Sequence, residues 1–150
     1  MPQWEQLAPV AVGGLVAIAF WDEDTVAVGS HSGLGLVDVR TGVTRGRVVD
    51  IDGSYPWYQA DPPSVRRDDP SGVVLVPAMG LWGGAFPTAT DDGWSAALDG
   101  HGAILSHKDG DVLVLRDDDE PTAFGFSPGC RVFALATSAT LHLCFRSSAT

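Results

Sequence analysis

The sequence is poor in positive charge. It has 9 Lys and Arg residues against 19 Asp and Glu in 150 residues, which gives a formal net charge of −10. Nucleic acids and anionic membrane surfaces bind proteins through clusters of Lys and Arg, so this composition argues against both classes of partner. A protein partner that carries positive charge is more natural, although an acidic surface can also serve solubility alone.

Cysteine and long apolar runs are scarce as well. Cys130 and Cys144 are too few for a disulfide scaffold, and both are expected to be free thiols in a reducing compartment. The apolar stretch 7–20 is interrupted by Pro9 and by two glycines, and no basic segment precedes it. It fits neither a signal peptide nor a membrane span, and a cytoplasmic location is expected.

Helical periodicity is also missing. No segment carries an apolar stripe over three helical turns, whereas short runs of alternating apolar residues are separated by Gly, Pro, Asp and Ser. The pattern predicts a single all-β domain over residues 1–150. Strands are expected at Leu15–Phe20, Thr25–Gly29, Leu34–Arg40, Val73–Val76, Ala103–Ser106, Asp111–Arg116, Thr122–Phe126, Arg131–Ala136 and Leu141–Phe145.

The expected strands fall into internal repeats. Segments 15–42, 94–118 and 122–148 can each be laid out as strand, turn, strand, turn, strand. A further repeat fits between the first two, with its first strand in 54–60 and its other strands in 71–90. The connection 61–72 is rich in Pro and charge and is expected to be a surface loop. About four degenerate three-stranded repeats result.

Two stretches resemble a known family. The stretch FSPGCRVFALATSATLHLCFR, residues 126–146, resembles a WD-repeat blade, and LVDVRTG, residues 36–42, is similar to a corner found in WD-repeat and quinoprotein-like β-propellers. The first stretch departs from the family pattern at Gly129-Cys130 and at Leu143-Cys144, where Asp-Gly and Trp-Asp would be expected. The resemblance implies a small propeller-like domain. Because blades usually take about 40 residues, a barrel-like arrangement is the alternative.

The stretch GSHSG, residues 29–33, comes nearest to a catalytic motif. A nucleophile elbow needs Ser at its centre and a helix after it, whereas His31 stands at the centre and an apolar run follows. A nucleotide-binding loop would need a third glycine where Asp38 stands. The glycines are therefore interpreted as turn residues. No catalytic residue or cofactor is expected, and the protein is not expected to be an enzyme.

Metal binding is not expected either. Zinc ligands come in close pairs at fixed spacing, a pattern that His101, His107 and the distant cysteines do not form. A calcium loop needs further oxygen ligands and a terminal Glu, which segments 50–53 and 109–111 lack. Both histidines are expected to lie in exposed turns.

Acidic and aromatic residues form the candidate contact surface. Acidic runs lie at expected turns, and the fold could gather them on one rim; four consecutive acids repel one another unless a basic partner offsets them. Exposed Trp beside carboxylates would suit an Arg-rich partner, although aromatic residues are more often core. The candidate binding residues are Asp117, Asp118, Asp119, Glu120, Asp91, Asp92, Trp57 and Trp82, and Asp22-Glu23-Asp24 is a further acidic run.

Three classes of function remain open. The first is a protein-binding module, more narrowly an immunity or antitoxin-type inhibitor of a basic toxin, because small size and strong acidity suit fast capture of such a partner. The second is a small-ligand-binding or enzymatic domain that uses a central pocket. The third is a structural domain that self-associates through its sheet edges, for example as a homodimer.

Overall fold

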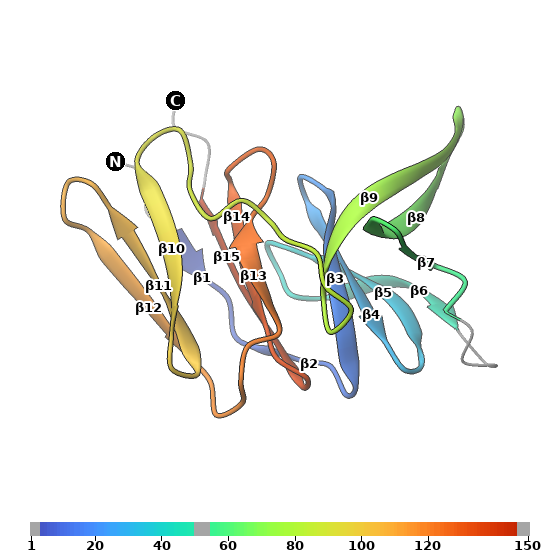
Figure 1. Ribbon diagram of the computed structural model, residues 1–150, viewed down its shortest axis with the longest axis horizontal. Helices are drawn as coiled ribbons and strands as arrows, with labels where there is room; N and C mark the ends of the chain where they lie inside the picture. Colours follow the sequence, from blue (N-terminus) through green and yellow to red (C-terminus); the bar gives the residue numbers. More distant parts are fainter. Residues whose placement is uncertain (1–3, 50–54, 147–150) are drawn as a thin grey trace.

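The computed structural model describes residues 4–49 and 55–146, which form antiparallel strands and no helix (Figure 1). The all-β class is therefore confirmed. The strands are β1 Trp4–Gln6, β2 Val10–Ala11, β3 Leu15–Asp22, β4 Thr25–Ser30, β5 Gly33–Asp38, β6 Thr44–Val49, β7 Tyr58–Ala60, β8 Pro63–Asp69, β9 Gly72–Gly80, β10 Trp94–Asp99, β11 Gly102–His107, β12 Val112–Arg116, β13 Ala123–Phe126, β14 Val132–Ala136 and β15 Thr140–Arg146.

The strands form three sheets. Seven strands follow the order β6-β5-β4-β3-β9-β8-β7, three follow β10-β11-β12, and the third sheet follows β1-β15-β14-β13 with β2 also paired to β15. Four sets of three consecutive strands pair in this way, namely β3–β5, β7–β9, β10–β12 and β13–β15. Within the described residues no sheet closes into a barrel.

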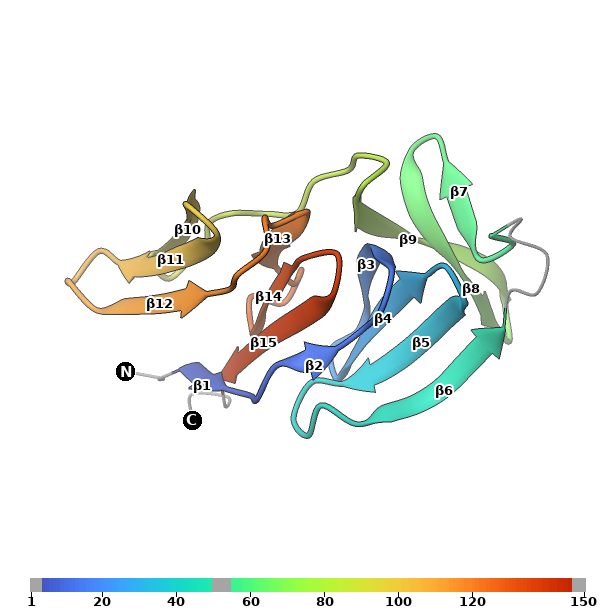
Figure 2. The same ribbon diagram turned by 90° about the horizontal axis from the view of Figure 1, so that it is seen from below.

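The four sets lie side by side (Figures 1 and 2). Apolar clusters fill the spaces between them. The central cluster joins β3–β5 to β13–β15 through residues such as Ile18, Val26 and Leu143. A second cluster joins β13–β15 to β10–β12, and a third joins β3–β5 to β7–β9. The order across the molecule is therefore β10–β12, β13–β15, β3–β5 and β7–β9.

Alternation along the strands explains why the two middle sets are buried on both faces. In β14, Ala134 faces the central cluster while Phe133 and Leu135 face β10–β12, and all three are fully buried. A strand with apolar residues at every position needs a partner on each side, whereas a strand with one polar face needs only one. The sets β10–β12 and β7–β9 therefore lie at the two ends.

The second repeat is built differently from the prediction. The expected surface loop 61–72 contains β8, whose residues 64–69 pair with β9. The charged residues of this segment are compatible with a strand because Arg67 donates hydrogen bonds to Asp69 in β8 and to the carbonyl of Trp21 in β3. The third strand expected within 71–90 does not form, because one long strand, β9, ends at Gly80 and only isolated bridges follow.

The nine expected strands all form, with ends that differ by a few residues from the prediction. Six strands were not in that set, namely β1, β2, β6, β7, β8 and β10, although β7 and β10 fall in segments 54–60 and 94–118, which were expected to begin repeats. Strand β6 carries Arg45 and Arg47 beside Gly46, so its composition resembles a loop. It forms because its backbone extends the sheet beyond β5.

Candidate functional site

The outer face of the β10–β12 set is largely exposed and combines apolar residues with Ser95, Ser106, Asp99 and Arg116. Register places Ala97, Ile104 and Val114 in one row across the three strands, with Ser106 and Val112 in the next row. Val112 is 61% exposed and Val114 is 42% exposed. Among the described residues eight large hydrophobic side chains are exposed, and seven of these lie in β10–β12, in β9 or directly after β9. The exposed large hydrophobic residues are therefore concentrated at the two end sets.

The acidic runs lie at opposite ends of this face rather than on one rim. Asp91 and Asp92 precede β10, at the end where Trp94 pairs with His107, whereas the run 117–120 follows β12 at the other end. Asp91 and the three acids 118–120 are exposed and form no ion pair within the described residues. The predicted single acidic rim is therefore wrong, because the antiparallel order separates the start of β10 from the end of β12.

Asp92 is half exposed and is held against the body of the molecule by Arg146. The two guanidinium nitrogens of Arg146 lie 2.6 and 3.1 Å from the Asp92 carboxylate oxygens, and Thr90 donates to the same carboxylate at 2.6 Å. The hydrogen bond from Arg146, followed by that from Thr90, lowers the pKa of Asp92 far below its usual range. Arg146 is itself nearly buried and stacks on the Trp4 ring. Asp92 therefore fastens β15 to the segment before β10.

Asp117 is also engaged within the fold. Its carboxylate accepts a hydrogen bond of 2.6 Å from Nε2 of His142, and the side chains of both residues are less than one tenth exposed. Burial alone would raise the pKa of Asp117, but the bonds from His142 and from the amide of Asp119 bring it below its usual value. The run 117–120 is thus divided: its first acid fastens β15 to β12, and the other three face solvent.

The two candidate tryptophans have different surroundings. Trp57 is 3% exposed, and its ring covers Gly29, where a Cβ atom would lie 2.2 Å from the indole. Trp82 is 41% exposed, and its ring centroid lies 5.0 Å from Tyr55 and 4.7 Å from Tyr58. Trp57 is therefore a core residue, while Trp82 presents part of its ring to solvent.

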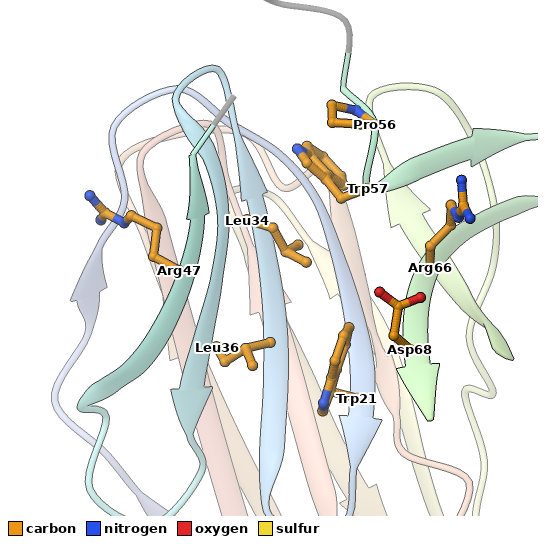
Figure 3. Close-up of a pocket in the computed structure, with 8 residues that line it drawn as sticks. All are labelled: Trp21, Leu34, Leu36, Arg47, Pro56, Trp57, Arg66 and Asp68. Atoms are coloured by element: carbon orange, nitrogen blue, oxygen red, sulfur yellow. The ribbon is translucent and has the colours of Figure 1, made fainter. Parts of the chain in front are cut away.

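A cleft of about 570 Å³ lies between β3–β6 and β7–β9. Figure 3 shows Trp57 and Trp21 at its two ends, Leu34 and Leu36 along one side, and Arg66 and Asp68 along the other. Arg47 and Pro56 complete the lining. The cleft exists because β3 and β9 pair over only three residues each, 17–19 with 78–80, so the two halves of the sheet diverge beyond that point.

Most cations of the protein are used in internal ion pairs. Six of the nine Lys and Arg side chains lie within 4 Å of a carboxylate: Arg40, Arg45, Arg67, Arg116, Arg131 and Arg146. Within the described part of the chain, Arg47, Arg66 and Lys108 have no acid partner. Two of these three line the cleft.

Histidine and cysteine have structural surroundings. His107, expected in an exposed turn, is 8% exposed because it packs on Trp94; its Nε2 donates to the carbonyl of Asp92, and its Nδ1 accepts from the amide of Asp109. His101 lies in the exposed β10–β11 turn. Burial raises the pKa of the Cys144 thiol to about 12, so this side chain is a neutral core residue.

Residues 4–49 and 55–146 contain no cluster of three or more His, Cys, Asp or Glu that could hold a metal ion. Across the same residues there is no helix of sufficient length and apolarity to cross a membrane.

Sequence reasoning missed the cleft and the two acid–base pairs. The partners Asp92 and Arg146 are 54 residues apart, and Asp117 and His142 are 25 apart, so no local pattern connects them. One signal did exist for Trp57: Gly29 interrupts an apolar strand, which often marks the close approach of another group. No protein-family model matches the chain, and no curated protein shows significant similarity to it.

Proposed function

We propose that this protein is a non-catalytic protein-binding module that engages a basic protein through the outer face of β10–β12. The observation that carries this proposal is the combination of exposed Val112 and Val114 with unpaired acids at both ends of the same sheet. Protein interfaces combine an apolar centre with a polar rim, and acids on the rim favour a partner with Lys and Arg at matching positions.

The charge distribution supports a basic partner. The internal ion pairs use most of the cations, and the exposed acids Asp91, Asp118, Asp119 and Glu120 form no ion pair in the described structure. Rim charges of one sign accelerate encounter with a partner of opposite sign. Capture of a basic toxin by an immunity or antitoxin-type inhibitor is the biological role that we propose for this surface.

The repeat architecture supports a scaffold rather than a reaction centre. We propose that the four three-stranded sets are degenerate propeller-like blades stacked in an open row, with β10–β12 as an end blade. In such a row, the outer face of an end blade lacks the neighbour that covers an inner blade. The same reasoning applies to β9, where Val73 and Leu75 are exposed, so self-association is the competing use of these faces.

The test begins with affinity purification from the native host and mass spectrometry, followed by binding kinetics with the purified partner. Three proteins are compared with the parent: Val112→Ser/Val114→Ser, Asp118→Asn/Asp119→Asn/Glu120→Gln, and Val43→Ser. Val43 is 59% exposed and lies in the β5–β6 turn, away from β10–β12, which makes it the matched control.

We expect the double Val variant to weaken affinity by about tenfold or more, mainly through faster dissociation. The acid variant should slow association and reduce its dependence on salt, and Val43→Ser should match the parent. Partners that are only acidic or neutral, or equal binding by all four proteins, would contradict the proposal. A concentration-dependent dimer that the Val variants abolish would favour self-association instead.

A further inference from the structure

We infer that the cleft between β3–β6 and β7–β9 binds a small organic anion with a flat apolar body. This site lies at the opposite end of the molecule from the outer face of β10–β12, so it does not rest on the function proposed above. Its juxtaposition of two indole rings, two leucines and an arginine without an acid partner carries the inference.

The size and lining of the cleft suit a small molecule. Its volume of about 570 Å³ falls within the range of roughly 300–1,000 Å³ that is usual for small-ligand pockets. Leu34 is buried at its base, and Trp21 and Leu36 are partly buried. A flat apolar group between Trp21 and Trp57 would cover Trp21 and Leu36, which the divergence of the sheet leaves partly exposed (Figure 3).

The charged residues that line the cleft favour an anionic ligand. In a protein with a net charge of −10, the cleft is lined by two arginines and one acid, Asp68. Figure 3 shows the guanidinium group of Arg47 directed away from the other lining residues, whereas Arg66 lies beside Trp57. Arg66 therefore supplies the anchor for a carboxylate or sulfonate, because guanidinium groups form charge-assisted hydrogen bonds with such anions.

The indole of Trp57 offers a second polar group. Its Nε1–H is buried and has no hydrogen-bond acceptor in the described structure. Buried donors normally have partners, but the indole nitrogens of Trp4 and Trp94 also lack an acceptor within the described residues; Trp57 differs from these two because it lines the cleft. Because this nitrogen is enclosed, an oxygen of the bound ligand reaches it only if the indole ring moves.

The experiment uses 2-naphthoate as the anionic probe and 2-naphthalenemethanol as its neutral analogue. Titrations are followed by NMR through the indole N–H signals of the five tryptophans, with Trp21 and Trp57 assigned by Trp→Phe variants. We expect 2-naphthoate to shift the signals of these two residues and to bind about tenfold more tightly than the neutral analogue.

Variants locate the anchor. Arg66→Gln should weaken 2-naphthoate about tenfold and leave the neutral analogue unchanged. Arg116→Gln is the matched control, because Arg116 pairs with Asp99 on the distant β10–β12 set, and it should bind both probes as the parent does. Absence of binding, equal affinity for the two probes, shifts confined to other tryptophans, or an unchanged affinity in Arg66→Gln would each overturn the inference.

Discussion

The two end sets each consist of three antiparallel strands, yet they join the middle of the molecule differently. The β10–β12 set packs its inner face on β13–β15 through a continuous apolar cluster, with an acid–base pair at each end. The β7–β9 set is continuous with β3 through three backbone pairs and leaves a cleft beside its apolar contacts. One end set therefore offers an outer face for contact, and the other offers a cavity.

This difference shows that polar pairs at the ends of an interface can determine how a sheet is oriented. Asp92–Arg146 and Asp117–His142 lie at opposite ends of β10–β12 and restrict its tilt against β15. At the other end of the molecule, Arg67 instead bonds Asp69 on its own strand, and its bond to Trp21 is to a carbonyl near the end of β3. We therefore expect the β10–β12 interface to be tighter than the β7–β9 interface.

The largest expected loss of stability comes from shortening a buried leucine, and one leucine in each interface provides the comparison. Leu105→Ala removes a fully buried side chain between β10–β12 and β13–β15 and should cost about 4 kcal/mol of unfolding free energy, because it creates a closed cavity. Leu34→Ala, in the wall of the cleft, should cost only about 2 kcal/mol because water can enter the enlarged space. Urea denaturation measures both. Equal losses would mean that the two interfaces are equally well packed.

A smaller effect is expected from adding a methyl group at Gly29, where the Trp57 ring packs closely. Gly29→Ala places a methyl group 2.2 Å from the indole ring, so the ring must move and the protein should lose about 1–3 kcal/mol. Gly46→Ala is the control, because its methyl group would meet the nearest atom, of Leu36, at 3.7 Å. Denaturation and tryptophan fluorescence report the loss and the ring movement. A Gly29→Ala protein with parental stability and fluorescence would refute the close packing of Trp57.

A third comparison sets Asp117, which pairs with His142, against its sequence neighbour Asp118, which is exposed. Asp117→Asn should cost about 1–2 kcal/mol because it weakens a buried hydrogen bond to His142, whereas Asp118→Asn should change stability by less than about 0.5 kcal/mol. Thermal or urea unfolding of both variants is the measurement. If the two variants are equally stable, the pair does not hold β12 to β15.

The smallest effect concerns Asp92 and its pH dependence. Asp92 is half exposed, so Asp92→Asn should cost about 1 kcal/mol at pH 7, and Asp91→Asn should cost almost nothing. The folded protein lowers the pKa of Asp92 below the usual 3.8, so its contribution is complete above about pH 5 and is lost as the pH falls. The stability difference between parent and Asp92→Asn should therefore shrink in acid. A difference that stays constant from pH 7 to pH 3 would exclude this linkage.

The sequence was sufficient to locate most of the strands but not to identify their partners. Alternation and turn residues located segments such as Val132–Ala136, because local chemistry determines whether a segment is extended. The prediction from sequence failed for β8, because its charged residues and proline suggested a loop although its backbone extends a sheet. The candidate residues divided similarly: exposure at Asp118 could be predicted from its turn, whereas the role of Asp117 depends on His142, which only the fold brings near.

The pairing of β1 with β15 bears on how the protein folds. Trp4 lies opposite Arg146, so this contact closes a loop that contains almost the whole chain. Hairpins such as β14–β15 close short loops and can form early, whereas the entropy cost of loop closure grows with the logarithm of loop length. During synthesis, β1 is made long before β15, so β1 cannot pair until β15 has been made. Such long-range contacts slow folding, and the edge of β15 stays open to other strands until β1 arrives.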